Sequence, residues 1–133
     1  MKPRKRRALG AATDDPCALA EWARAELDAA IRKKDGVGIR EAAEKVWLAT
    51  SSVADVVAEG LGVRPPKGQK ARRAVLATLE REAKLHPKAL VGHFDFASEF
   101  LHGNCFHEAQ CPSHRLLTAS VDDTIDFAKE AFR

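Results

Sequence analysis

The residues best suited to chemistry gather near the C-terminal end of the chain, in His102-Gly-Asn-Cys-Phe-His-Glu-Ala-Gln-Cys-Pro-Ser-His114. The three histidines and two cysteines of this segment are side chains that bind zinc. The candidate ligands are Cys105, His107, Cys111 and His114. Structural zinc sites pair short spacings at both ends of a loop, and this segment does not reproduce such an arrangement. We therefore expect no metal, with His102 and His107 at the negative end of a helix and Cys105 packed as a small apolar group.

A second group of polar residues lies on one predicted helix. Asp95, Glu99 and His102 are spaced i, i+4 and i+7, so on an α-helix their side chains share one face. Such a row can bind a cation or orient an imidazole, and Asn104 and His107 extend it as candidate ligand-binding residues. It is also typical of any solvated helix face. Because neither a nucleophile nor a Gly-rich loop accompanies the row, we assign it no catalytic role.

Composition indicates one globular domain. The 133 residues are 45% hydrophobic and 31% charged, which is enough to bury a core without cross-links. The three cysteines are an odd number, so reduced thiols are the simplest expectation. No apolar run approaches the roughly 18 to 20 residues of a spanning helix, which predicts no membrane association and a cytoplasmic location. The Lys67–Lys70 stretch has one glycine and no preceding strand, which excludes Walker and dinucleotide-binding folds, and we expect no cofactor.

Basic charge is concentrated at the N-terminal end. The net charge is +3, and five positive charges lie between residues 2 and 7, so the rest of the chain carries −2. Residues 1–13 lack an apolar stripe, which predicts a flexible basic arm ahead of one domain at residues 14–133. The candidate nucleic-acid contacts are Lys2, Arg4, Lys5, Arg6 and Arg7.

Apolar residues recur every three to four positions in five segments, as in amphipathic helices. We expect one helix to begin near Pro16 after a cap at Asp14 or Asp15, and others over residues 39–59, 70–85, 88–106 and 112–133. The expected core residues are Leu19, Ala23, Leu27, Ala30, Ile39, Ala43, Val46, Thr50, Val53, Val57, Val75, Leu76, Leu79, Ala83, Phe94, Phe96, Ala97, Phe100, Leu101, Leu117, Val121, Ile125, Ala128 and Phe132. Short loops between five helices predict an all-α, antiparallel up-and-down bundle.

Several single positions carry further expectations. Gly36 and Gly38 should break the chain before the second helix, and Gly60 should end it with a left-handed cap. Glu26 falls inside an apolar stripe, where pairing with a nearby Lys is the simplest interpretation, and Leu48 points away from the core, where it could start a dimer contact. The third segment has a basic outer face, interpreted as solvated, with Lys67, Lys70, Arg72, Arg73 and Arg81.

Two stretches resemble a known family. Arg40-Glu-Ala-Ala-Glu-Lys-Val-Trp-Leu-Ala49 and Phe100-Leu-His-Gly-Asn-Cys-Phe-His107 are similar to the HEPN superfamily of helical bundles, and within it to the small archaeal paREP-type group. The resemblance spans roughly residues 16–132. It implies a HEPN-like up-and-down bundle that often dimerises and, in many members, a metal-independent RNA endonuclease. Those nucleases use an arginine followed, after about four to six residues, by a histidine.

The arginine of that nuclease motif is missing at the expected place. His102 fits the histidine position, but Asp95, Phe96 and Ala97 stand where the arginine would be. Arg81 and His86 satisfy the spacing, although at the end of the third segment and beside Glu82 instead of a small polar residue. A chain rich in arginine yields such spacings by chance.

Three functional hypotheses follow. The first is a non-catalytic HEPN-like bundle that binds itself as a homodimer, a partner protein, or a nucleotide or RNA strand. The second is a ribonuclease with a site formed across a dimer, in which His102 or His86 acts as base and Arg81 stabilises phosphorane charge. The third and weakest is a metal-binding protein that uses the His102–His114 segment.

Overall fold

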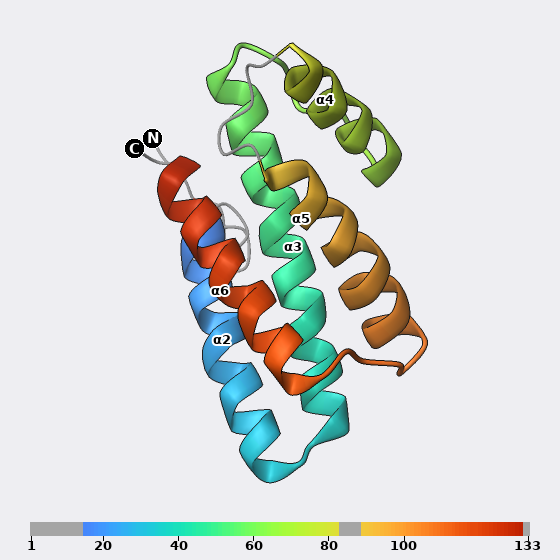
Figure 1. Ribbon diagram of the computed structural model, residues 1–133. Helices are drawn as coiled ribbons and strands as arrows, with labels where there is room; N and C mark the ends of the chain where they lie inside the picture. Colours follow the sequence, from blue (N-terminus) through green and yellow to red (C-terminus); the bar gives the residue numbers. More distant parts are fainter. Residues whose placement is uncertain (1–14, 83–88, 132–133) are drawn as a thin grey trace.

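The computed structural model describes residues 15–82 and 89–131, and every regular element in these ranges is a helix (Figure 1). The elements are α2 (Pro16–Lys33), α3 (Gly36–Gly60), α4 (Gln69–Arg81), α5 (Leu90–Phe96), the π-helix η1 (Ala97–His107) and α6 (His114–Ala131). Because η1 continues α5 directly, the chain forms five helical rods, which confirms the predicted all-α class and helix number. The predicted arm at residues 1–13, together with Asp14, Ala83, His86 and Phe132, lies outside the described residues.

A short turn joins α2 to α3. Asp15 caps α2 by accepting hydrogen bonds from two backbone N–H groups at 3.1 and 3.2 Å, with Pro16 in the first turn. The helix ends where Lys34 adopts the left-handed conformation, with φ of 55°. Asp35 then caps α3 by accepting a hydrogen bond from the Gly38 N–H at 3.0 Å. Both aspartates therefore act through side-chain oxygens that satisfy free N–H groups at a helix start.

The expectation that Gly36 and Gly38 break the chain was wrong, because both lie in the first turn of α3. A Cβ atom added at Gly38 would stand 2.7 Å from Asp35 Oδ2 and 3.0 Å from the Cβ of Ala30. Glycine at position 38 thus allows the cap and the end of α2 to approach α3 closely.

Helix α3 lies between the other elements and contacts α2, η1, α6, α4 and α5 (Figure 1). All six residues predicted for its apolar face are buried: Ile39, Ala43, Val46, Thr50, Val53 and Val57. The predicted α2 face is buried as well, and Glu26 pairs with Lys45 of α3 at 2.9 Å, which confirms the expected lysine partner. Burial of apolar surface on several sides of α3 therefore organises the core.

The left-handed residue at the end of α3 is Gly62, and not Gly60 as was expected. Gly60 is the last helical residue, and the positive φ of 82° occurs at Gly62. The N–H of Val63 donates to the carbonyl of Ala58 at 2.9 Å, which closes the helix end. The Gly60 cap prediction was therefore wrong, because the left-handed residue follows a further turn.

Helix α4 is shorter than predicted, and its basic face is partly paired. Leu76 and Leu79 are buried, whereas Val75 is only half-buried. Arg72 contacts Asp55 of α3 at 2.9 Å, so that part of the supposed solvated face holds α4 against α3. None of the helices in residues 15–82 and 89–131 is long and apolar enough to cross a membrane.

The single helix predicted over residues 88–106 consists of the α-helix α5 followed directly by the π-helix η1. From Ala97 the backbone follows a π-helix, in which hydrogen bonds reach back five residues and the turn is wider. Residues spaced by four, Ala97, Leu101 and Cys105, are buried along it. Phe94 is fully buried as predicted, but the predicted core residues Phe100, in the π-helix, and Phe96, in α5 before it, are 38% exposed and half-buried.

Helix α6 packs against α2 and α3. Leu117, Val121 and Ala128 are buried as predicted, and Ile125 is half-buried. The helix also brings a polar group into the core, because the hydroxyl of Thr124 lies 2.6 Å from His93 Nε2 and 3.1 Å from Thr50 Oγ1. The hydroxyls of Thr50 and Thr124 also donate to backbone carbonyls four residues earlier, at 2.8 and 3.0 Å.

Burial determines the charge of His93. Desolvation lowers the pKa of its imidazole from 6.5 to about 4, so the ring is neutral at pH 7. In the unfolded chain the ring titrates near its ordinary pKa. Its contribution to stability is therefore complete above about pH 6.5 and is lost as the pH falls from there to about 4.

We expect the free energy of unfolding to fall by up to about 3 kcal/mol more between pH 7 and pH 4 in the natural protein than in His93→Gln, because glutamine has no proton to bind in the unfolded state. Urea unfolding followed by circular dichroism across that range measures the difference. His107→Gln, at an exposed position, serves as the control and should keep the natural pH dependence. An equal pH dependence in His93→Gln and the natural protein would contradict this account.

Candidate functional site

The predicted row of Asp95, Glu99 and His102 does not form in the structure. Asp95, in the last turn of α5, pairs with Arg73 of α4 through two contacts of 3.0 and 2.8 Å. His102 turns toward Glu44 of α3, with Nδ1 at 2.7 Å from Oε1, and Glu99 is exposed. The i, i+4 and i+7 argument assumed α-helical geometry, and the π-helix from Ala97 onward breaks that register.

The Glu44 and His102 pair forms the centre of a different cluster, between α3 and η1. Both side chains are largely covered, with relative exposures of 20% for Glu44 and 29% for His102. A carboxylate beside Nδ1 favours the proton on that nitrogen, which leaves Nε2 as the acceptor. Such an arrangement holds an imidazole in one orientation, a property shared by structural and acid–base histidines.

Aromatic rings surround this histidine. The His102 ring lies 5.5 Å from Trp47, 6.3 Å from Phe106 and 4.6 Å from His107, measured between ring centroids. Trp47 is buried, Phe106 is half-buried and His107 is exposed, so the cluster runs from the core to the surface. The structure therefore brings together two predicted ligand-binding residues, His102 and His107, with partners from α3.

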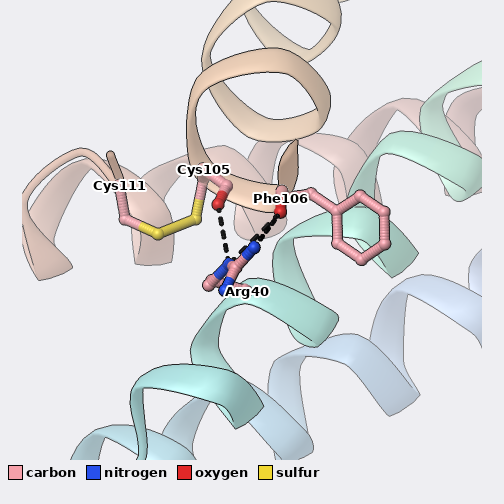
Figure 2. Close-up of a disulfide and its surroundings, with 4 residues drawn as sticks. All are labelled: Arg40, Cys105, Phe106 and Cys111. Atoms are coloured by element: carbon pink, nitrogen blue, oxygen red, sulfur yellow. Dashed lines mark hydrogen bonds between the residues drawn. A yellow bond between two sulfur atoms is a disulfide. The ribbon is translucent and has the colours of Figure 1, made fainter. Parts of the chain in front are cut away.

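Arg40 fixes the end of η1 (Figure 2). Its Nε donates to the carbonyl oxygens of Cys105 and Phe106 at 3.3 and 3.2 Å, and its Nη2 donates to that of Phe106 at 2.7 Å. The last carbonyls of a helix lack partners within the helix and carry negative partial charge, so a guanidinium satisfies both needs. Since Arg40 and Glu44 stand one turn apart on α3, one helix face holds two points of η1.

A disulfide crosses the same end of η1. Cys105 and Cys111 are bonded, with Cα atoms 3.9 Å apart (Figure 2). The prediction of reduced thiols was wrong for these two residues, because their Cα atoms lie close enough for a bond across the turn. Bonded sulfurs are not thiolates, so Cys105 and Cys111 are not available as zinc ligands here. Cys17 is a free thiol, and burial and the neighbouring Glu21 raise its pKa.

The remaining candidates are dispersed. His114 begins α6 and is exposed, and the backbone carbonyl of Asn104 accepts a hydrogen bond from Gln110 N–H at 2.7 Å. The described residues contain no group of three His, Cys, Asp or Glu side chains placed to hold a metal ion. Arg81 donates to Thr78 on its own helix at 3.2 Å, while His86 is outside the described residues. The five basic arm residues Lys2, Arg4, Lys5, Arg6 and Arg7 are also outside them.

Sequence reasoning missed Arg40 and Glu44 as members of the site. Their spacing of four residues on the polar side of the second helix was visible, but nothing in the sequence showed that η1 would lie against that side. The contact between α3 and η1 decides this, and it is one of the most extensive in the molecule.

We expect Arg40→Ala to lower the free energy of unfolding by about 2 kcal/mol, because the charge-assisted bonds to the carbonyls of Cys105 and Phe106 are lost. Arg40→Lys should recover only part of this loss, since an ammonium lacks the planar fork of a guanidinium. Urea unfolding and amide hydrogen exchange at residues 103–110 measure both effects. Arg32→Ala, at an exposed position on α2, should change neither; equal behaviour of Arg32→Ala and Arg40→Ala would contradict the assignment.

Comparison of this chain with protein-family models, with curated proteins and with solved structures finds no match.

Proposed function

We propose that this chain is a non-catalytic HEPN-like helical bundle, with its helices in antiparallel up-and-down order, which acts by binding. The observation that carries the proposal is that side chains capable of chemistry hold helices together instead. The Asp95 carboxylate pairs with Arg73, His102 pairs with Glu44, and Arg40 binds backbone carbonyls. A carboxylate or guanidinium held in such contacts is a poor candidate for proton transfer to a substrate, whereas the pair of His102 with Glu44 fits a structural role and an acid–base role equally.

Exposed apolar side chains support self-association as the first form of binding. Leu48 of α3 is 44% exposed and Phe100 of η1 is 38% exposed, on two elements that pack against each other. Leu48 borders a groove of about 440 Å³ between α3 and α4, together with Val56 and the buried Trp47. Exposed apolar residues beside a groove are typical of protein contact surfaces. The proposed partner is a second copy of the chain, and another protein is the alternative.

The basic arm supports a second form of binding, to RNA or another nucleic-acid strand. The chain outside residues 2–7 carries a net charge of −2, so attraction to phosphate depends on the arm. Two arginines of the α4 face, Arg72 and Arg73, are engaged by Asp55 and Asp95 and add little to that attraction. The same proposal includes a cytoplasmic location. In that compartment, cellular thiols would reduce the disulfide between Cys105 and Cys111.

For self-association, we expect the natural protein to sediment at twice the chain mass at micromolar concentration and Leu48→Glu to sediment as a monomer, because a buried carboxylate opposes the contact. Val37→Glu, at an apolar residue that is 62% exposed at the start of α3, is the matched control and should remain a dimer. Analytical ultracentrifugation of all three proteins distinguishes the outcomes. A monomeric natural protein, or a dimer unaffected by Leu48→Glu, would count against this surface.

One feature favours a second candidate function, a HEPN-type ribonuclease with a site formed across a dimer. The carboxylate of Glu44 orients the His102 imidazole, as carboxylates orient catalytic histidines. In this alternative His102 acts as general base, and an arginine, Arg81 in the original hypothesis, stabilises the charge on phosphorus. The exposed position of Arg81 on α4 fits a contribution to a neighbouring copy.

A single experiment separates the two functions. A labelled RNA is incubated in EDTA with the natural protein, with residues 9–133 and with His102→Ala. The binding proposal expects intact RNA throughout, salt-dependent retardation by the full chain, and loss of that retardation without the arm. The ribonuclease alternative expects cleavage that His102→Ala abolishes. Retardation that persists without the arm would remove the arm from the proposal.

A further inference from the structure

A cavity lies between α5 and α6, beside Glu80 of α4. Its volume is about 560 Å³, the size of many small-molecule sites. The lining residues that matter below are His93, Phe96, Leu116, Ser120, Asp123 and Phe127. None of them belongs to the cluster around His102.

Ser120 is the first sign of a ligand. Its side chain is only 4% exposed, and its Oγ has no hydrogen-bond partner. By contrast, the hydroxyls of Thr50 and Thr124, which lie together near His93, both donate to backbone carbonyls. A buried hydroxyl without a partner destabilises the fold, so its position beside a cavity points to a group that arrives with a ligand.

The walls of the cavity favour an aromatic ligand. Phe96 of α5 and Phe127 of α6 line it, and the Phe127 ring lies 5.0 Å from the His93 ring. Leu116, at the cavity's edge, is 50% exposed, which is a high value for a leucine on a packed helix. Aromatic side chains offer edges and faces against which a flat ring packs.

The charges of the cavity favour a cation. Among the residues that the structure describes, its lining includes two carboxylates, Asp123 and Glu80, and no lysine or arginine. His93 adds no positive charge at pH 7, because burial lowers its pKa to about 4. Burial first, and then repulsion from Asp126 and Asp122, raises the pKa of Asp123, which a neighbouring cation would counteract. Aromatic faces also attract ammonium groups directly.

We propose that this cavity binds a small aromatic amine, with its ring against Phe96 and Phe127, its ammonium group at Asp123 and a hydrogen bond to Ser120. The site is independent of the binding surfaces described above, because it lies on α5 and α6 and uses none of Leu48, Phe100 or the basic arm. Binding would supply the missing partner of the Ser120 hydroxyl and a counter-charge for Asp123.

The test uses benzylamine as the probe and benzoate as its counterpart of opposite charge. Titration of each into the full-length protein, followed by chemical-shift changes of backbone amides on α5 and α6, measures affinity and location together. We expect benzylamine to bind with a dissociation constant on the order of 1 mM, as suits eight heavy atoms, and benzoate to bind at least tenfold more weakly. Equal binding of the two probes, shifts located elsewhere, or no shifts at all would overturn the proposal.

Variants assign the contacts. Asp123→Asn and Ser120→Ala should each raise the benzylamine dissociation constant roughly fivefold, through loss of the ion pair and of the hydrogen bond. Glu41→Gln, at an exposed position on α3, is the control and should bind as the natural protein does. Should a cavity variant fail to fold, the comparison of benzylamine with benzoate on the natural protein still decides the outcome.

Discussion

Burial of α3 among its neighbours is the constraint on which the other features depend. A helix that contacts five other elements must be small or apolar on most of its surface, and α3 is lined by alanine and valine where α2 and α6 meet it. One side of α3 carries larger side chains that η1 covers. Arg40, Glu44 and Trp47 share that side and all meet η1 residues. The candidate site is thus a consequence of how the core is filled.

The π-helix explains why this contact takes an unusual form. Its wider turn buries residues four apart and turns Phe100 to the surface. The same geometry separates Asp95 from His102, so that each carboxylate and imidazole finds a partner on a different helix. At the end of the π-helix, Arg40 donates hydrogen bonds to the carbonyls, and the disulfide between Cys105 and Cys111 links the last turn to the following loop.

The cluster around His102 and the cavity between α5 and α6 differ in whether their polar groups have hydrogen-bond partners within the protein. Around His102, the Glu44 carboxylate pairs with Nδ1 and Arg40 binds the carbonyls at the end of η1, which suits a structural joint beside a binding surface. In the cavity between α5 and α6, the buried Ser120 hydroxyl has no hydrogen-bond partner, and the charged residues among the described lining are both acidic. A satisfied network stabilises a fold, whereas an unsatisfied one is best explained by a molecule that completes it.

The sequence by itself determined the helices and their buried faces. Apolar periodicity is a local property, so the faces of α2, α3 and α6 and the cap at Asp15 could be predicted without knowing any neighbour. Tertiary structure alone decided which polar residues meet. Three contacts show this: the Glu44 and His102 pair, the Arg40 hydrogen bonds and the disulfide. The residues in them come close only because of the way the helices pack and because η1 is a π-helix. Residue spacing along the sequence predicts neither the packing nor the π-helix.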